Sequence, residues 1–248
     1  MNVQKLLLLF LVISLQTEAQ YDRKLQVQSA KWSVNWKQVT AVPSLLVGLG
    51  LMATMDNDVL YREDFYEQRN KWIPLFRTHV DDYLQYAPIV GVIVLNATGV
   101  KGEHDVVNQA ALLIKSELIM AAIVLPLKKL TAVPRPDTHS LNSFPSGHTA
   151  QAFVAATFLH KEYGKENPLF SVLAYSTATG VGLLRVMNNR HWISDVLVGA
   201  GIGIFATHLA YLTHQNKVGH KRKRLSGTLL VPSYGQRSFG MGMVIPIH

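Results

Sequence analysis

Apolar residues are concentrated in the later part of the chain, in long stretches that polar and charged residues separate. Several stretches approach the roughly 20 residues that a helix needs to cross a bilayer, and the last one contains no charged residue. This pattern predicts an all-α membrane bundle of about five to six helices. The stretches are Tyr86–Val100, Val106–Leu127, Gly147–Leu159, Leu169–Met187 and Val196–Leu212.

The N-terminus has the pattern of a secretory signal peptide. A lysine precedes the apolar run Leu6–Leu15, and Thr17-Glu18-Ala19 ends this segment with residues that suit cleavage. We predict that residues 1–19 are removed, and the alternative is a retained anchor. Residues 20–83 follow as an amphipathic region expected at the membrane interface.

The helical core is expected over residues 84–215, and residues 216–248 form a basic segment and a tail. The tail segment Leu229–Ile247 is rich in glycine, valine and aromatic residues, and Gly235–Ser238 has the composition of a turn. This composition predicts a short C-terminal β-hairpin, and the alternative is a tail without regular structure.

Charge and composition narrow the classes of partner. The 248 residues carry a formal net charge of +8, which suits an anionic partner such as phosphate or a lipid surface. No nucleic-acid-binding motif is present, so we expect no nucleic acid partner. The chain has no cysteine, which excludes thiolate catalysis and cysteine-ligated zinc. Glu103-His104-Asp105 has metal-binding residue types, but adjacent side chains diverge, so we expect a solvated loop and no metal site.

Three polar segments lie at the ends of the apolar stretches, as a shared active site at one end of the bundle requires. The first contains Lys128 and Arg135-Pro136, and the second is Pro145-Ser146-Gly147-His148. The third contains Arg185, His191 and Asp195.

His191 and Asp195 are four residues apart, which puts both side chains on one face if the segment is helical. An aspartate that binds one imidazole nitrogen fixes the tautomer and leaves the other nitrogen free to attack. With the positive charge of Arg185 nearby, this arrangement predicts a histidine nucleophile that accepts a phosphoryl group.

The second segment precedes an apolar helix, and helix N-termini bind phosphate through free backbone N–H groups. Gly147 allows close approach, Ser146 offers a hydroxyl, and His148 can protonate a leaving oxygen. Cationic side chains can bind phosphate oxygens and stabilise the transition state without a metal. The cationic candidates are Lys128, Arg135 and Arg185.

Together the three segments, over roughly Lys128–Gly199, resemble the signature of the type 2 phosphatidic acid phosphatase and vanadium haloperoxidase superfamily. The resemblance implies a metal-independent phosphoric ester hydrolase without a cofactor. In the implied roles His191 is phosphorylated, Asp195 orients it and His148 is the general acid. The implied phosphate-binding residues are Lys128, Arg135, Ser146, Gly147 and Arg185.

The chain departs from the family pattern at Leu184, where a small residue usually precedes the arginine. This departure puts a secondary phosphate contact in doubt and leaves the reaction type unchanged. Selective contacts to the substrate are expected from Asp56–Tyr83 and Pro136–Phe144.

The basic cluster Lys221–Arg224 follows the last apolar stretch, and the positive-inside tendency places it in the cytoplasm. Counting back puts all three polar segments on the external side, which is the periplasmic face of an inner membrane. The count requires that Pro43–Met55 does not span. If it does, the signal is retained as a further helix or the tail lies outside.

We therefore predict a membrane-bound phosphatase that acts on a lipid phosphomonoester or diphosphate. The alternatives are a secreted soluble acid phosphatase of the same superfamily and a non-catalytic lipid-binding protein. Phosphatidic acid, phosphatidylglycerol phosphate, isoprenyl diphosphate and a phosphorylated glycolipid all remain open as substrates. The sequence does not determine the oligomeric state.

Overall fold

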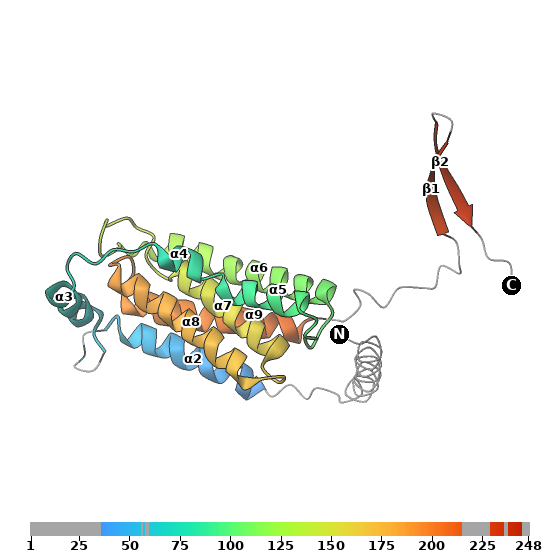
Figure 1. The fold of residues 1–248 in the computed structure, drawn as a ribbon. Helices are drawn as coiled ribbons and strands as arrows, with labels where there is room; N and C mark the ends of the chain where they lie inside the picture. Colours follow the sequence, from blue (N-terminus) through green and yellow to red (C-terminus); the bar gives the residue numbers. More distant parts are fainter. Residues whose placement is uncertain (1–35, 56, 58–59, 215–228, 236–237, 245–248) are drawn as a thin grey trace, which may run out of the picture. The chain divides into compact units, whose positions relative to one another are not determined.

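The computed structural model describes residues 36–55, 57, 60–214, 229–235 and 238–244, and within them the chain forms eight helices and two strands (Figure 1). The signal peptide predicted at residues 1–19 and the cluster Lys221–Arg224 lie outside the described residues. The helices are α2 (Trp36–Met52), α3 (Arg62–Trp72), α4 (Val80–Leu84), α5 (Ala87–Ala97), α6 (Val106–Thr131), α7 (Gly147–Tyr163), α8 (Pro168–Met187) and α9 (Ile193–Leu212).

Each apolar stretch predicted from the sequence forms one helix, from α5 to α9 in chain order. Local signals set where these helices begin. The Asp105 side chain accepts a hydrogen bond from Asn108 N (2.8 Å) at the start of α6. Asn167 accepts one from Leu169 N (2.9 Å) at the start of α8, whose first residue is Pro168. Asparagine and aspartate satisfy amide groups that a first helical turn leaves free, and proline lacks that amide.

The loop before α6 differs from the prediction of a solvated segment. His104 Nδ1 lies 2.9 Å from Glu162 Oε1, near the end of α7, and the Glu162 side chain is buried. The Asp105 side chain caps the N-terminus of α6. The loop is therefore tied to the bundle, because its side chains satisfy a buried carboxylate and a helix terminus.

Within the bundle, α7 packs against α5, α6, α8 and α9. Its close neighbour α9 approaches it at two glycines. A Cβ atom at Gly199 would lie 2.6 Å from Ser146 O, and one at Gly203 would overlap Ala150 O and lie 3.0 Å from Val154 N. Since these are backbone atoms, only glycine allows the two helices to come so close. This crossing holds the start of α7 beside the start of α9.

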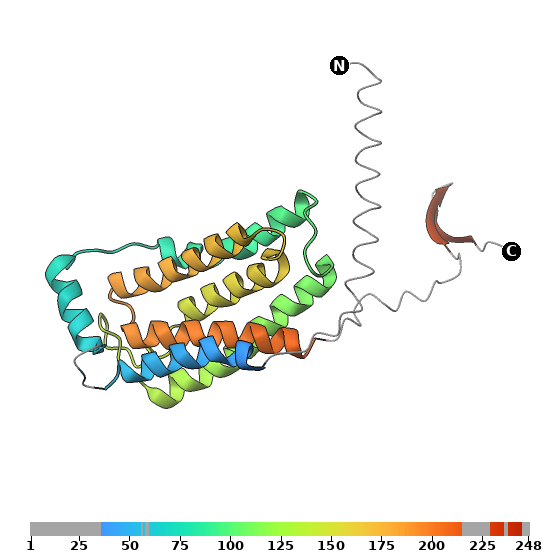
Figure 2. The ribbon, with the colours of Figure 1, turned by 90° about the horizontal axis from the view of Figure 1, so that it is seen from below.

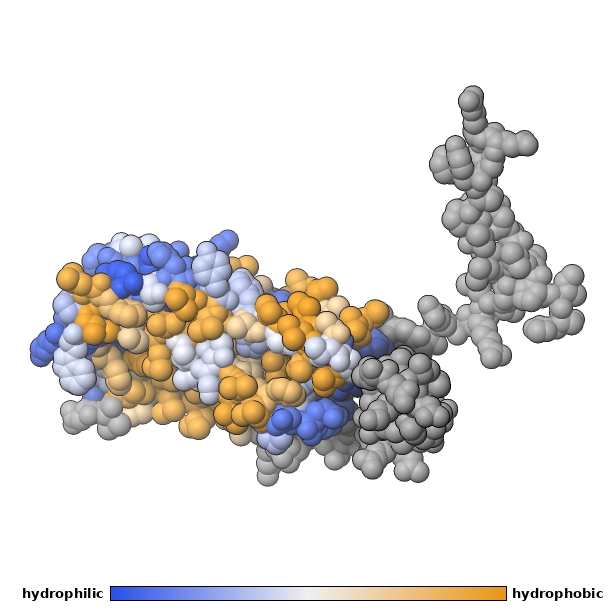
Figure 3. All heavy atoms as spheres, viewed as in Figure 1, coloured by the Kyte–Doolittle hydropathy of each residue, from blue (hydrophilic) through white to orange (hydrophobic). Residues whose placement is uncertain are grey.

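Three helices, α6, α8 and α9, are long and apolar enough to cross a membrane, whereas α5 and Val39–Met52 of α2 are shorter apolar helices. Large apolar side chains such as Leu118, Leu125 and Val172 are exposed on α6 and α8. In the view of Figure 3, hydrophobic residues cover the middle of the bundle and hydrophilic residues gather toward its ends. An apolar outer surface of this kind suits contact with lipid chains. The predicted membrane helical bundle is confirmed.

Helix α2 lies along α9, as Figure 2 shows. A Cβ atom at Gly50 would lie 2.6 Å from Val198 Cγ2, and one at Gly201 would lie 2.9 Å from Pro43 O. The apolar run that begins at Pro43 therefore contributes a helix that packs on the bundle.

Arg69 of α3 anchors this short helix at the end of α8. Its guanidinium donates to Met187 O from Nε (2.9 Å) and from Nη2 (2.7 Å), and also to Phe76 O (3.1 Å). Met187 is the last residue of α8, so a cation binds a free carbonyl at the negative end of the helix dipole. The chain then continues from Phe76 to α4 beside the same end of α8.

The C-terminal strands β1 (Leu229–Gly235) and β2 (Ser238–Val244) pair antiparallel. The register runs from Leu229 opposite Val244 to Gly235 opposite Ser238. These strands occupy the segment predicted as a hairpin, and they meet at the predicted turn.

Candidate active site

His191 and Asp195 form a buried pair at the start of α9. Nδ1 of His191 lies 3.3 Å from Oδ2 of Asp195, and the two side chains are 1% and 0% exposed. The pair does not lie along one helix face, because α9 begins at Ile193 and the carboxylate reaches back to a residue before the helix. When Nδ1–H donates to the carboxylate, Nε2 keeps its lone pair and can act as a nucleophile.

Three further donors hold the Asp195 carboxylate in place. Oδ2 accepts from Trp192 N (3.1 Å) and from Ser143 Oγ (2.5 Å), and Oδ1 accepts from Ser194 Oγ (3.3 Å). Trp192 is the N-cap residue, so the same carboxylate closes the first turn of α9 and orients His191. The orientation of the imidazole is therefore set by helix geometry.

The surroundings of His191 keep it uncharged at neutral pH. Burial lowers the pKa of His191 to about 4, although the hydrogen bond and charge of Asp195 oppose this change. The positive charges of Arg135 and Lys128 contribute to this lowering of the pKa. A neutral imidazole is the form that can attack an electrophile.

Lys128 and Arg135 bind the loop that carries Ser143. Lys128 Nζ donates to Asn142 O (2.7 Å) and Ser143 O (3.3 Å), and Arg135 Nε donates to the Asn142 side-chain oxygen (2.8 Å). Because Ser143 in turn binds Asp195, this loop links both cations to the histidine–aspartate pair. The first and third polar segments are thus linked through Asn142 and Ser143, which precede the second polar segment.

The start of α7 borders the same site. Ser146 N donates to Asp195 O (3.0 Å), which ties the second segment to the third. The Ser146 hydroxyl is the N-cap of α7 and accepts from Thr149 N (3.4 Å), so its contact with phosphate stays a prediction. A Cβ atom at Gly147 would meet nothing nearer than Lys128 Cε, at 3.9 Å. A methyl-sized group therefore fits beside this glycine, and the binding of an anion at this helix N-terminus stays a prediction.

Arg185 and His148 meet through helix α4. Arg185 is buried, and its Nη1 donates to Asp81 Oδ2 (2.5 Å) and to Asp82 Oδ1 (3.2 Å). His148 Nε2 lies 3.0 Å from the same Asp82 oxygen. Nε of Arg185 is buried and has no hydrogen-bond partner among the described residues. A buried donor without a partner is costly, so this nitrogen is a candidate to bind an oxygen of a ligand.

The fold brings the predicted site residues to one end of the bundle. This end is formed by the last turns of α6 and α8 and by the starts of α7 and α9. The residues gathered there are Lys128, Arg135, Ser146, Gly147, His148, Arg185, His191 and Asp195.

Sequence reasoning missed several polar residues that contact the site. Ser143 binds Asp195, and Asp81 and Asp82 bind Arg185. All three fall in the two regions from which selective contacts were expected. A serine in a loop and two adjacent aspartates have no distinctive spacing, so no sequence signal singled them out.

The fold and the site define a membrane-embedded helical protein with a buried histidine–aspartate pair beside several cationic side chains. Residues 109–218 match the model of the PAP2 superfamily, and the three polar segments lie inside this range. This part of the chain is therefore similar to the PAP2 superfamily, as the resemblance of those segments predicted.

A curated relative is the lipid A 1-phosphatase of Porphyromonas gingivalis. It is 37% identical over 164 residues, which cover 62% of this chain and 36% of that protein. The matched part of the chain thus spans little more than a third of the length of this relative.

Two solved structures are also similar. The structure of Aquifex aeolicus LpxE is 24% identical with a TM-score of 0.45, and the match covers 59% of this chain and 93% of that one. A transmembrane PAP2-type phosphatidylglycerolphosphate phosphatase from Bacillus subtilis is 20% identical with a TM-score of 0.47, and the match covers 76% and 99% of the two chains.

Proposed function

We propose that the chain is a membrane phosphatase that cleaves a phosphate from a lipid through a phosphohistidine at His191. The observation that carries the proposal is the buried pair of His191 and Asp195 next to Lys128 and Arg135. The pair supplies an oriented, neutral nucleophile, and the cations supply fixed positive charge for a phosphoryl group.

In the first step, Nε2 of His191 forms a bond to phosphorus while the bond to the leaving oxygen breaks. His148 donates a proton to that oxygen as the alcohol departs. Lys128, Arg135 and Arg185 balance the charge that spreads over the three equatorial oxygens. In the second step, a water oxygen bonds to phosphorus as the bond between phosphorus and His191 Nε2 breaks, and the water gives a proton to His148. Phosphate leaves, and both histidines return to their starting state.

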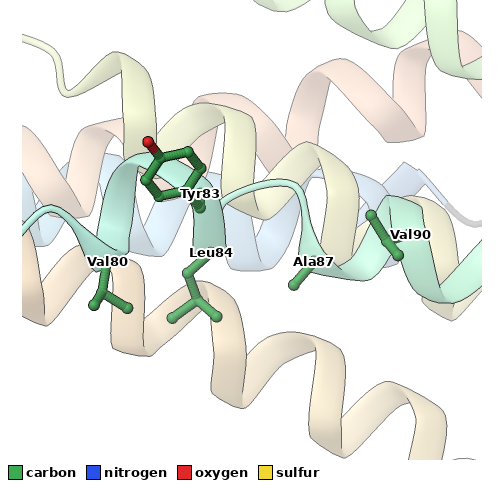
Figure 4. Close-up of a pocket in the computed structure, with 5 residues that line it drawn as sticks. All are labelled: Val80, Tyr83, Leu84, Ala87 and Val90. Carbon is green, nitrogen blue, oxygen red and sulfur yellow. The ribbon is translucent and has the colours of Figure 1, made fainter.

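A lipid substrate is supported by the surroundings of α4 and α5. A shallow, open apolar groove of about 510 Å³ lies along these helices and is lined by Val80, Tyr83, Leu84, Ala87 and Val90 (Figure 4). The groove begins on the helix that carries Asp81 and Asp82, so an acyl chain there would lie close to Arg185 and His148. Apolar clefts with a few polar groups at one end suit ligands with a long apolar part.

The relative from Porphyromonas gingivalis makes a phosphorylated glycolipid the first substrate to test. Phosphatidic acid, phosphatidylglycerol phosphate and an isoprenyl diphosphate complete the set of candidate substrates. All four present a phosphoryl group at a membrane surface, which is where the site residues would meet it.

We also infer that the site faces the periplasm. Helix α7 begins at the site and ends at Tyr163, and Lys161 and Lys165 lie at that far end. A cytoplasmic position for these lysines, and for the basic segment after α9, agrees with the positive-inside tendency.

Phosphate release from the four lipids by the purified protein in detergent tests the function. We expect the variant His191→Ala to lose at least about 10⁴-fold in kcat, because the proposed phosphoenzyme forms on this imidazole. His160→Ala, at the opposite end of α7, is the matched control and should retain activity. Comparable activity in His191→Ala and the unmodified protein would contradict the mechanism.

A further inference from the structure

Asp82 of α4 is a carboxylate placed among the residues proposed to bind the substrate. Its Oδ1 atom lies 3.0 Å from His148 Nε2 and 3.2 Å from Arg185 Nη1. Its other oxygen, Oδ2, lies 3.2 Å from His79 Nδ1 on the same short segment. One carboxylate oxygen therefore contacts both the proposed general acid and a proposed phosphate-binding cation.

The neighbouring Asp81 has a different position. It is fully buried, and its two oxygens accept from Arg185 Nη1 (2.5 Å) and from Asn188 Nδ2 (3.0 Å). Asn188 also exchanges two hydrogen bonds with the backbone of Thr78, which fixes α4 against the end of α8. Asp81 thus holds Arg185 in place, whereas the Asp82 side chain is 41% exposed and can move away.

The contacts of Asp82 are those that a substrate oxygen needs. In the proposed reaction, the leaving oxygen must lie within hydrogen-bond reach of His148, and a phosphoryl oxygen must lie near Arg185. A carboxylate oxygen already accepts from both groups. Two anionic oxygens cannot share these donors, because like charges at such distances repel. The carboxylate and the substrate therefore compete for one position.

We propose that Asp82 is a specificity-determining residue that occupies the leaving-group position before substrate binds and faces the leaving group once substrate has displaced it. The inference rests on the proposed function and deepens it. The displaced carboxylate stays on α4, beside the leaving oxygen, because Asp81 and Asn188 keep that helix in place.

This position selects by the charge of the leaving group. A sugar or another leaving group with hydroxyl donors can bond to the Asp82 carboxylate. A diphosphate substrate instead brings a second phosphate there, and the two anions repel. The site should therefore prefer a phosphomonoester with a hydroxyl-bearing leaving group over a lipid diphosphate.

The variant Asp82→Asn keeps the shape of the side chain and removes its charge. Asp64→Asn is the matched control, since Asp64 is an exposed aspartate on α3, a helix that contacts the same end of the bundle through Tyr66 and Trp192. Both full-length variants are purified in detergent and titrated with inorganic phosphate by calorimetry. kcat and KM are then measured for a glycolipid 1-phosphate and for an isoprenyl diphosphate.

We expect Asp82→Asn to bind inorganic phosphate about tenfold more tightly and to lower the ratio of kcat/KM between monoester and diphosphate about tenfold. Asp64→Asn should change either quantity less than about twofold. Equal phosphate affinities in the two variants would overturn the proposal, and so would an unchanged substrate ratio.

A fall in kcat with unchanged phosphate affinity would also overturn the proposal, because it would make Asp82 a positioning residue for His148. If neither the variants nor the unmodified protein release phosphate from any lipid, the proposed function is wrong. The proposed specificity role of Asp82 is then wrong as well. The phosphate titration still decides in that case whether Asp82 occupies the anion position.

Discussion

At the scale of single residues, the candidate site contains side chains that make structural contacts in addition to the chemical roles proposed for them. The Asp195 carboxylate caps the first turn of α9 through Trp192 N and holds His191 Nδ1. Arg185 is buried against Asp81 and still has a nitrogen without a partner among the described residues. Catalytic geometry of this kind is precise because packing and capping hold the side chains.

Gly147 provides a test at this scale. Its Cβ position is open apart from Lys128 Cε at 3.9 Å, so the variant Gly147→Ala should fold with unchanged or slightly higher stability. The added methyl group would enter the space proposed for the phosphoryl group. We expect kcat/KM to fall about 10- to 100-fold, because a displacement near 1 Å at a reacting centre has effects of that size.

Gly180→Ala on α8 is the control for this variant, since Gly180 also has open space around it and lies in the middle of a different helix. Thermal unfolding in detergent and phosphate release separate folding from activity. Full activity in Gly147→Ala would show that the start of α7 does not contact the phosphoryl group.

At the scale of elements, the crossing of α7 and α9 determines the site. Gly199 lets α9 approach Ser146, and Gly203 lets it approach Ala150. The crossing brings together the second and third polar segments, which are then joined by the hydrogen bond from Ser146 N to Asp195 O. Helices that approach this closely need small residues at the contact, in membranes as in water.

The variant Gly203→Ala should therefore disturb both the fold and the site. Its Cβ would overlap Ala150 O and lie 2.9 Å from Phe153 Cβ, and backbone atoms cannot move aside cheaply. We expect a loss of about 1–3 kcal/mol in stability, seen as a lower melting temperature in detergent, together with reduced activity. The control is Gly48→Ala, which has nothing within 4 Å of its Cβ. Equal melting temperatures for the two variants would contradict the proposed role of this contact.

At the scale of the whole molecule, the site and the far end of α7 should lie on opposite sides of the membrane. The chain contains no cysteine, so single cysteines can report which side each end faces. Ser140→Cys lies in the exposed loop near Arg135, and Glu166→Cys lies in the exposed turn after α7.

A membrane-impermeant maleimide added to intact spheroplasts should label Ser140→Cys and leave Glu166→Cys unlabelled. Both positions should react after detergent is added, which controls for accessibility. Labelling of Glu166→Cys but not of Ser140→Cys in intact spheroplasts would place the site in the cytoplasm.

The sequence by itself determined the order of the later helices and predicted the residue types that the candidate site brings together. Apolar stretches of membrane length leave few alternatives to a helix, because every backbone group in a bilayer must find a partner within the segment. The residue types of the three polar segments suit phosphoryl transfer wherever they meet, so the PAP2 resemblance could be stated from Lys128 to Gly199 alone.

Only the tertiary structure decided how these segments meet and which other residues join them. Asp81 lies 104 positions before Arg185 in the chain, and Ser143 lies 52 positions before Asp195. Such contacts depend on how closely the helices pack and on how Arg69 and Asn188 fasten α3 and α4 to α8. A pattern along the sequence reports which face of a helix is apolar, but contacts between distant side chains arise only when the helices are assembled.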